Sequence, residues 1–173
     1  MVCPQCSAIT DKGKRCKRNT CIKYPLCWQH MKTKEGLELK KSEIPDAGQG
    51  VFATRDFPYN NTKKGKTQNK PITYYSAKKI SNKPNPNSAY VLRVNDKEYL
   101  DSENPSNFSG KYINSFRNHP DVRKRYANVR FGASQRIYRK NDRFVVPILQ
   151  KKTIKKGDEL YLNYGKMYPF ENN

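Results

Sequence analysis

IKKGDELYLNYG, at residues 154–165, is the most informative stretch of this 173-residue sequence. Lys156, Gly157 and Asp158 are typical of a turn, and ELYLNY is typical of a short strand that ends at Tyr164. Taken alone, this stretch indicates nothing more than an ordinary hairpin. Its meaning depends on two earlier stretches, GQGVFATRDF from residue 48 and KYINSFRN from residue 111.

The two earlier stretches are also weak signals when each is considered by itself. Gly48-Gln49-Gly50 precedes a strand pattern but has neither the G-x-G-x-x-G spacing nor the following helix of a dinucleotide-binding fold. KYINSFRN sets Asn114 among aromatic and apolar residues. Each stretch is compatible with a purely structural turn, so only their order along the chain can point to a function.

Short strand patterns dominate the rest of the sequence and predict a mainly β fold with little helix. They occur at residues 37–42, 51–57, 72–76, 89–94, 97–101, 127–131, 135–140 and 143–150. The pair Asn95-Asp96 predicts a hairpin turn. Residues 58–72 predict a long basic loop, and the best helical segment is a short one between Asn114 and Arg125.

The charge balance is strongly basic. Lys and Arg number 35 against 15 Asp and Glu, which gives a formal net charge of +20. Such a charge favours polyanionic surroundings, above all nucleic acid, although a merely solvated basic surface would look the same. No apolar run approaches the ~18–20 residues of a membrane span, and the start MVCPQCSAIT lacks a secretory pattern. We therefore expect an intracellular protein without a membrane partner.

Residues 1–33 combine metal-binding side chains with the absence of an apolar core. The ligand candidates are Cys3, Cys6, Cys16, Cys21, Cys27 and His30. CPQC and CWQH each place two donors three positions apart, so that one turn can offer both to a single ion. Clustered thiols in a reducing compartment favour zinc over a disulfide cluster. Geometry alone would select Cys3, Cys6, Cys27 and His30 as the four ligands.

CSAITDKGKRCKR and the later CWQH resemble a small Cys3His motif that is common in proteins of large DNA viruses. The resemblance implies a structural zinc ion held by Cys6, Cys16, Cys27 and His30. It places Thr10 and Gly13 in a turn and leaves Cys3 and Cys21 as extra thiols. It also implies a viral protein, which would act in the host nucleus or in a virus factory.

In order, the motifs of the main domain resemble those of SET-domain protein lysine methyltransferases. GQGVFATRDF matches the family's GxG followed by V/L-F-A, and Tyr75-Ser76-Ala77 matches its Y-x-G with alanine in place of glycine. KYINS matches [RK]-[FY]-[IV]-N-H-S, with serine where the family has histidine, and Asn128 matches a later asparagine. GDELYLNYG matches G-x-E-L-x-x-D-Y-G, with Asn163 in place of aspartate.

This resemblance implies the fold and the domain organisation. The family fold consists of small curled β-sheets in which one segment threads under another as a pseudoknot. We therefore expect a zinc-binding module at residues 1–33, a SET domain at 34–168 and a C-terminal tail at 169–173.

The same resemblance implies the activity, which is methyl transfer from S-adenosylmethionine to a lysine of a histone or another basic protein. The implied catalytic residues are Tyr164 and Tyr75, and the implied cofactor-binding residues are Gly48, Gln49, Gly50, Tyr112, Asn114 and Ser115. Leu162 and Phe131 stand where the family limits the number of methyl groups with a tyrosine. Neither carries a hydroxyl group, which predicts di- or trimethylation.

A non-catalytic zinc- and nucleic-acid-binding protein that uses the same scaffold is the competing interpretation. The charge of +20 favours it, because a basic enzyme repels a basic tail unless nucleic acid bridges the two. The retained Tyr164, Asn114 and glycine pair favour the enzyme. The sequence leaves the substrate, the target lysine and a homodimeric state open.

Overall fold

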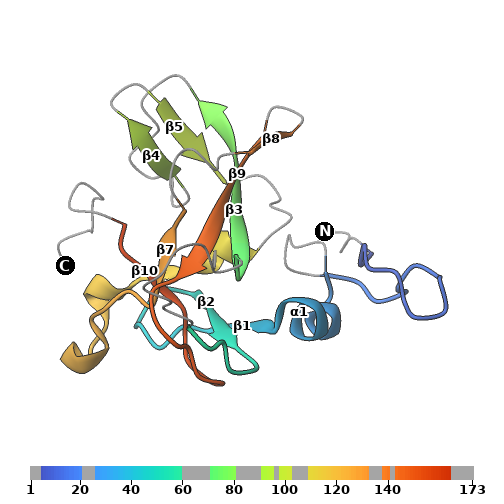
Figure 1. Cartoon of the computed structure of the whole chain (residues 1–173), viewed down its shortest axis with the longest axis horizontal. Coiled ribbons are helices and arrows are strands. Elements are labelled where there is room, and N and C mark those ends of the chain that lie inside the picture. Colours follow the sequence, from blue (N-terminus) through green and yellow to red (C-terminus); the bar gives the residue numbers. More distant parts are fainter. Residues whose placement is uncertain are drawn as a thin grey trace, which may run out of the picture.

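The computed structural model describes residues 5–20, 26–59, 71–80, 91–95, 98–102, 109–132, 138–140 and 143–164. Within these ranges the protein is mainly β and has one α-helix, which confirms the predicted fold class (Figure 1). The elements are α1 (Trp28–Glu35), β1 (Leu37–Lys41), β2 (Gln49–Ala53), β3 (Thr73–Ile80), β4 (Val91–Asn95), β5 (Glu98–Asp101), η1 (Ser109–Tyr112), β6 (Asn114–Ser115), η2 (Phe116–Asn118), η3 (Val122–Lys124), β7 (Val129–Phe131), β8 (Tyr138–Lys140), β9 (Arg143–Gln150) and β10 (Tyr161–Leu162).

The largest sheet has the order β4-β5-β3-β9-β7, with β8 also paired to β9. Its central strands β3 and β9 are antiparallel, with Tyr75 opposite Val146. Alternate residues of β3, namely Thr73, Tyr75 and Ala77, are buried, as expected when one face of a strand covers a core. β4 and β5 form the hairpin that the sequence predicted between them.

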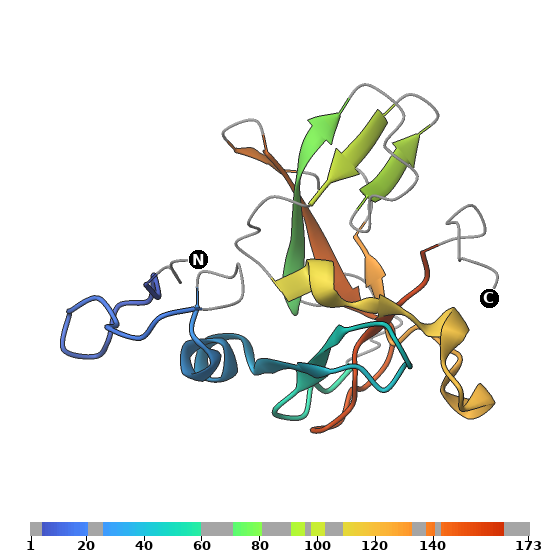
Figure 2. The same cartoon turned by 180° about the vertical axis from the view of Figure 1, so that it is seen from behind.

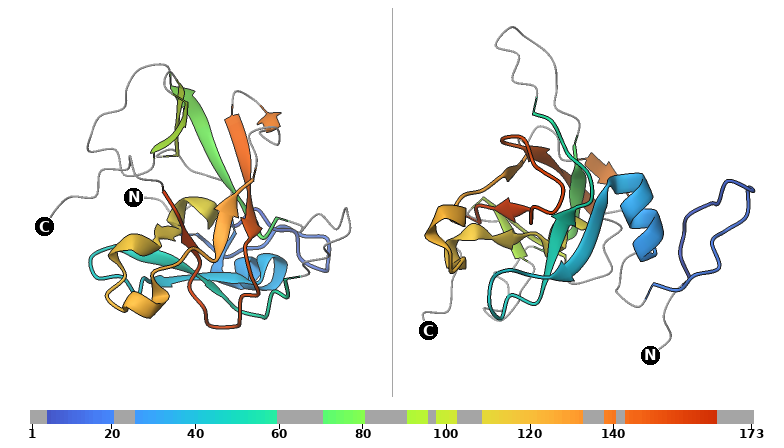
Figure 3. Two further views of the ribbon diagram at one scale, coloured as in Figure 1. Left: turned by 60° about the vertical axis from the view of Figure 1, so that its left-hand side comes forward. Right: turned by 90° about the horizontal axis from the view of Figure 1, so that it is seen from below.

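Two smaller sheets have two strands each, namely the antiparallel pair β1-β2 and the parallel pair β6-β10. Residues 154–162, near the end of the described chain, connect these two sheets. This segment pairs with β2 through the bridge Phe52↔Glu159, and with the residues after β2 through the bridge Phe57↔Ile154. Its end, β10, then pairs in parallel with β6, with Tyr161 opposite Asn114. The C-terminal segment thus lies between β2 and β6, and Figure 3 shows it beside these two strands.

One hydrophobic core joins these sheets. Its buried members come from β1, β2, β3, β7, β9 and the C-terminal segment, and they include Leu37, Val51, Tyr75, Ile113, Val129, Val146, Ile148, Ile154, Leu160 and Leu162. The hairpin of residues 5–20 stands apart from this core on the far side of α1 (Figure 2). Its buried residues Cys6, Ala8 and Cys16 form a separate cluster with Cys27, which directly precedes α1.

The helix prediction was wrong in its position. Residues 114–125 form β6 and the short 3-10 turns η2 and η3, whereas the α-helix lies at Trp28–Glu35. This helix buries only Met31 against the protein, so it has no apolar periodicity for sequence reasoning to detect. It ends at Gly36, which has a left-handed φ of 70°. Among the described residues, no helix combines the length and hydrophobicity needed to span a bilayer.

The strand predictions agree with the structure except at their ends. β2 begins at Gln49, two residues before the predicted start, and β10 is limited to Tyr161–Leu162. The predicted turn at Lys156 to Asp158 is present, with Gly157 at a φ of 95°. Most of the predicted basic loop, at residues 60–70, lies outside the described residues, as does the tail at 169–173.

Candidate functional site

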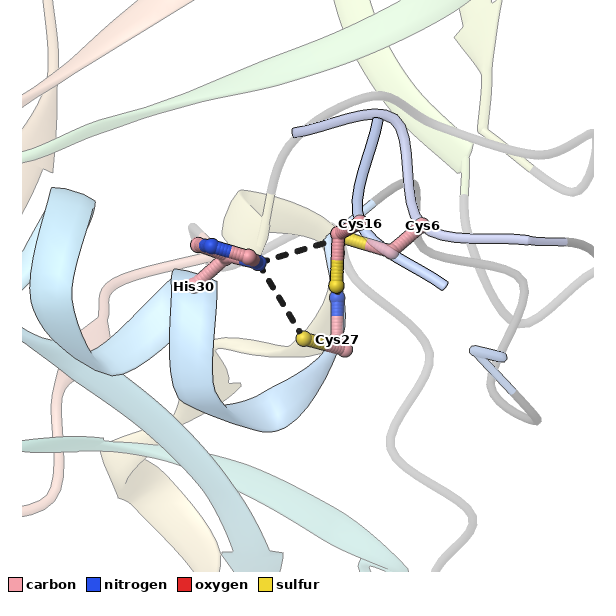
Figure 4. Close-up of side chains that lie close together, drawn as sticks. All are labelled: Cys6, Cys16, Cys27 and His30. Carbon is pink, nitrogen blue, oxygen red and sulfur yellow. Dashed lines mark hydrogen bonds between the residues drawn. The ribbon is translucent and has the colours of Figure 1, made fainter. Parts of the chain in front are cut away.

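Four metal-binding side chains converge in the N-terminal module. The sulfur atoms of Cys6, Cys16 and Cys27 and a nitrogen of His30 all lie within 4.8 Å of one another (Figure 4). His30 Nδ1 is 3.5 Å from Cys6 Sγ and 3.4 Å from Cys27 Sγ. A tetrahedral zinc ion with ordinary bond lengths separates such sulfur and nitrogen atoms by about 3.5 Å.

A short hairpin and the helix α1 hold these four side chains in place. The hairpin closes through hydrogen bonds from Cys6 N to Arg18 O (2.7 Å) and from Cys16 N to Ala8 O (2.8 Å). Its tip is the predicted turn, in which Gly13 N donates to Thr10 O at 2.9 Å. Cys27 directly precedes α1, and His30 lies in the first turn of that helix.

This donor set fits zinc well. Three buried thiols and one imidazole are a usual ligand set for a closed structural site, which leaves no position for a substrate. Of the two ligand sets that the sequence left open, the structure assembles the one with Cys16. Cys3 and Cys21 lie outside the described residues.

The Gly48–Gly50 turn meets the Asn114 strand in the main domain. The Asn114 side chain donates from Nδ2 to Gln49 O at 3.0 Å. Gly48 adopts a left-handed φ of 69°, which glycine reaches without strain, and its surroundings are open. Gly48 and Gln49 are exposed, so the outer edge of this turn is free to contact a ligand.

Gly50 has a different and internal reason to be glycine. The Glu159 side chain fills the space beside it, and a Cβ atom at residue 50 would lie 2.1 Å from Glu159 Oε1. The sequence suggested that both glycines allow close approach of a cofactor. The structure shows that Gly50 allows close approach of a buried carboxylate.

Glu159 is almost fully buried and is surrounded by hydrogen-bond donors. Its Oε1 accepts from Ser42 Oγ at 2.7 Å and from Asn114 Nδ2 at 3.4 Å. Its Oε2 accepts from Glu43 N and from Tyr161 OH, both at 2.8 Å. One carboxylate thus joins the loop after β1, the β6 strand and the C-terminal segment, a role that sequence reasoning missed.

Asn128, the predicted later asparagine, also holds the C-terminal segment. Its Nδ2 donates to Glu159 O and its Oδ1 accepts from Tyr161 N, each at 2.7 Å. Both bonds are buried, so the Asn128 amide satisfies a backbone carbonyl and a backbone N–H of this segment in the way that a neighbouring strand would. The resemblance matched Asn128 to a later asparagine of the family without giving it a role, and its contacts in the structure are with this segment.

A second polar cluster lies next to Tyr161. The buried ring of His119 stands edge-on to Tyr161, with ring centres 5.5 Å apart. His119 Nδ1 accepts from Asp121 N at 3.0 Å, and Nε2 lies 3.3 Å from Glu43 Oε2. Burial, and next its hydrogen bond to Glu159, raises the pKa of Tyr161 far above its usual value. The hydroxyl of Tyr161 therefore stays protonated and keeps donating to Glu159.

Four aromatic side chains gather at the edge of the core. Tyr75 is buried and stands edge-on to Phe131, with ring centres 5.9 Å apart. Tyr112 and Tyr164 are partly buried against the same core cluster. The Tyr164 hydroxyl donates to Ile113 O at 2.5 Å. Ile113 directly precedes Asn114 in the sequence, so this bond fixes Tyr164 beside the Asn114 strand.

Ser115 contributes an unusual polar atom. Its Oγ is buried and has no hydrogen-bond partner within the described part of the chain. A buried hydroxyl group without a partner costs free energy, so Ser115 Oγ is a candidate to hydrogen-bond a ligand at this site. Six of the predicted residues thus lie on adjoining segments, namely Gly48, Gln49, Tyr112, Asn114, Ser115 and Tyr164. Tyr75 belongs to the same hydrophobic core, against which Tyr112 and Tyr164 pack.

Comparisons with known proteins agree with this geometry. The family model described as SET domain matches residues 48–165. This match covers more than half of the chain, and the chain belongs to the SET domain family. No curated protein sequence matches it significantly.

Solved structures show the same fold at low identity. A chain of polycomb repressive complex 2 from Chaetomium thermophilum is 20% identical with a TM-score of 0.50, covering 77% of this chain and 16% of that one. Another structure of that complex, bound to S-adenosylmethionine, is 20% identical with a TM-score of 0.49, covering 78% of this chain and 16% of that one.

A candidate histone methyltransferase from Plasmodium falciparum is 17% identical with a TM-score of 0.48. The match covers 77% of this chain and 96% of that one. The chain therefore spans about a sixth of the polycomb chains but nearly the whole Plasmodium chain.

Proposed function

We propose that this protein is an S-adenosylmethionine-dependent protein-lysine N-methyltransferase. The observation that carries the proposal is the meeting of the three SET motifs in one place. Asn114 bonds to the Gly48–Gly50 turn, and Tyr164 bonds to Ile113 next to it. Residues that are 65 and 51 positions apart in the sequence are thereby joined at one edge of the core.

The cofactor-binding residues would be those around the Gly48 turn and the β6 strand. S-adenosylmethionine, when bound, supplies an electrophilic methyl group. The exposed backbone of Gly48 and Gln49 can meet the polar groups of such a ligand. The buried Ser115 Oγ offers it a hydrogen bond that no described residue takes.

The aromatic residues would prepare the substrate lysine. A free lysine has a pKa of about 10.4, so its amine must lose a proton before it can attack. Tyr75 and Phe131 form an apolar wall that disfavours the ammonium form and excludes water. The Tyr164 hydroxyl, fixed by Ile113 O, positions the amine, and most of the rate enhancement comes from this alignment.

We also propose a histone or another basic, chromatin-like protein as the substrate. The enzyme carries +20 charges, so a free basic tail would be repelled. A substrate that is bound to DNA would present phosphates to the enzyme, which reverses the sign of the long-range interaction. Reduced thiols around a metal site support an intracellular location, in the nucleus or, for a viral protein, a virus factory.

The test is a methyl-transfer assay on free histones and on nucleosomes, read by mass spectrometry. We expect a mass gain on lysine that requires S-adenosylmethionine and is faster on nucleosomes. Calorimetric titration with the cofactor separates the enzyme from the competing non-catalytic protein. Absence of cofactor binding by folded, zinc-loaded protein would favour the non-catalytic interpretation, which the exposed basic zinc module supports.

A further inference from the structure

The zinc module carries a surface that the proposed methyl transfer does not use. Trp28, the single tryptophan of the chain, is 66% exposed at the start of α1. The guanidinium carbon of Arg18 stands 5.8 Å from the centre of its ring. An exposed indole costs hydrophobic free energy, and such a side chain commonly marks a binding site.

The four metal ligands fix both members of this pair. Trp28 follows the ligand Cys27 directly, and Arg18 is two residues after the ligand Cys16, whose sulfur accepts from Arg18 N at 3.5 Å. Arg18 also donates a side-chain hydrogen bond to Gln29 in α1. The hairpin and the helix have no large shared core, so a metal ion held by these four residues would fix the indole and the guanidinium relative to each other.

The surroundings of the pair are basic. Residues 11–18 contain five exposed cationic side chains and one acid, Asp11. The five cationic residues are Lys12, Lys14, Arg15, Lys17 and Arg18. Within the described ranges none of these five forms an ion pair. Among the described residues the other exposed aromatic is Tyr126, which has Lys152 Nζ 3.4 Å from its ring centre. It follows the segment in which Arg123 pairs with Asp121 and Lys124 with Glu43.

We propose that the zinc module binds single-stranded nucleic acid through Trp28 and Arg18. An unpaired base stacks on the exposed indole, and the neighbouring lysines contact the phosphates. A stacking platform next to a guanidinium, within a run of unpaired cations, suits this ligand better than an acidic protein, which has no base to stack. A duplex keeps its bases inside and leaves the indole unused. This inference does not depend on the methyltransferase activity.

Because Trp28 is the only tryptophan, its fluorescence reports on this site alone. We expect oligo-dT and oligo-U to quench it in the full-length zinc-loaded protein, with an affinity that falls steeply with salt. Poly-glutamate and duplex DNA, as matched polyanions, should quench it far less. Equal quenching by poly-glutamate would overturn the choice of nucleic acid. If one of the two oligonucleotides quenches Trp28 at a lower concentration than the other, the preferred ligand is single-stranded DNA for oligo-dT or single-stranded RNA for oligo-U.

Anisotropy of a labelled oligonucleotide tests the residues. We expect Trp28→Ala to weaken binding about 10-fold or more, since stacking of one base contributes that much. Trp28→Phe should retain part of the affinity, because a phenyl ring can still stack on a base. That outcome would show that binding requires an aromatic ring at residue 28. The control is Tyr126→Ala, which removes the other exposed aromatic with a lysine over its ring and should leave binding unchanged.

Zinc content and circular dichroism of each variant show whether the module is intact. A Trp28→Ala protein that holds zinc and binds like the parent would overturn the proposal. So would oligonucleotide binding that raises anisotropy without quenching Trp28, because it would place the strand elsewhere. Chelation of zinc should abolish the quenching, and quenching that survives chelation would contradict the role of the metal in building this surface.

Discussion

The carboxylate of Glu159 fills the space that a side chain at residue 50 would need, with Oε1 2.1 Å from the Cβ position of Gly50. The two residues are far apart in the sequence and belong to different motifs. The glycine of one motif is thus explained by the acid of another. A resemblance to a family identifies both residues, but only the structure shows that each one requires the other.

Gly50→Ala should therefore lower the free energy of unfolding by about 1–3 kcal/mol through overpacking. In a Glu159→Ala background the same change should cost less, since the clashing carboxylate is gone. Gly48→Ala is the control: its surroundings are open, so it should cost about 1 kcal/mol of backbone strain in both backgrounds. Denaturant unfolding measures all three, and equal Gly50→Ala costs in the two backgrounds would contradict the pairing.

Tyr164→Phe should separate catalysis from folding. The hydroxyl bonds to Ile113 O at a partly buried position, so its removal costs about 1 kcal/mol of stability. Loss of the group that positions the amine should reduce methyl transfer about 100-fold or more. Cofactor affinity, measured by calorimetry, should change little. Full activity of the variant would remove Tyr164 from the proposed mechanism.

The number of methyl groups added depends on the hydroxyl groups near the amine. Phe131 packs on Tyr75 without a hydroxyl, Leu162 is buried, and the Tyr161 hydroxyl is committed to Glu159. We expect di- or trimethyl products at saturating cofactor, as seen by mass spectrometry. Phe131→Tyr should shift the product toward monomethyl lysine. An active parent enzyme that stops at one methyl group would refute this expectation.

Metal analysis should find about one zinc ion per chain. Cys27→Ser and His30→Ala should release it and unfold the hairpin and the start of α1, because the module has only a minimal core of its own. Cys3→Ser and Cys21→Ser are the matched controls and should retain the ion. Loss of zinc from Cys3→Ser would instead restore the alternative set in which Cys3 replaces Cys16.

Glu43 should make a small, pH-dependent contribution to stability. A hydrogen bond from Lys124, and next one from His119, lowers the pKa of its carboxyl group in the folded protein. The contribution is therefore present above the unfolded pKa of about 4.3 and is lost as the pH falls through the lower folded value.

Glu43→Gln should lower the unfolding free energy at pH 7 by less than ~1 kcal/mol, since the side chain is partly exposed. Parent and variant should converge once the pH falls below the lowered folded pKa, where the carboxyl of the parent is protonated. Unfolding curves of the two proteins, compared at each pH, measure the difference. A difference that stays constant down to that pH would exclude the ion pairs as its cause.

Local patterns predicted the local features of this fold. The hairpin at Asn95, the turn at Gly157 and most strands follow from alternation and turn residues that stand close together in the sequence. The metal ligands were predicted because their spacing resembles a known motif, and the structure assembles that set. Spacing alone pointed to Cys3, which lies outside the described residues, and it cannot show that a hairpin brings Cys16 next to Cys6 and Cys27.

Features that depend on distant partners could not be predicted. Glu159 follows a turn, where the sequence would suggest a surface acid. In the structure it is buried and accepts four hydrogen bonds, most of them from segments distant in the sequence. The His119–Glu43 contact joins residues 76 positions apart. Helix α1 begins directly after Cys27, which makes no side-chain N-cap hydrogen bond, and it buries one side chain. Its sequence therefore has neither the capping residue nor the apolar periodicity from which a helix could be predicted.

The place of residues 154–162 between β2 and β6 has a kinetic consequence. β2 finds its partner about a hundred residues later in the chain, and β6 finds its partner 47 positions later, at Tyr161 and Leu162. Contacts between such distant segments form slowly, because the closure of long loops must precede any stabilising interaction. During synthesis, Asn114 and the Gly48–Gly50 turn therefore emerge well before the strand that joins them. The proposed cofactor site can therefore be completed only after residue 162 has left the ribosome, well after its first two motifs have emerged.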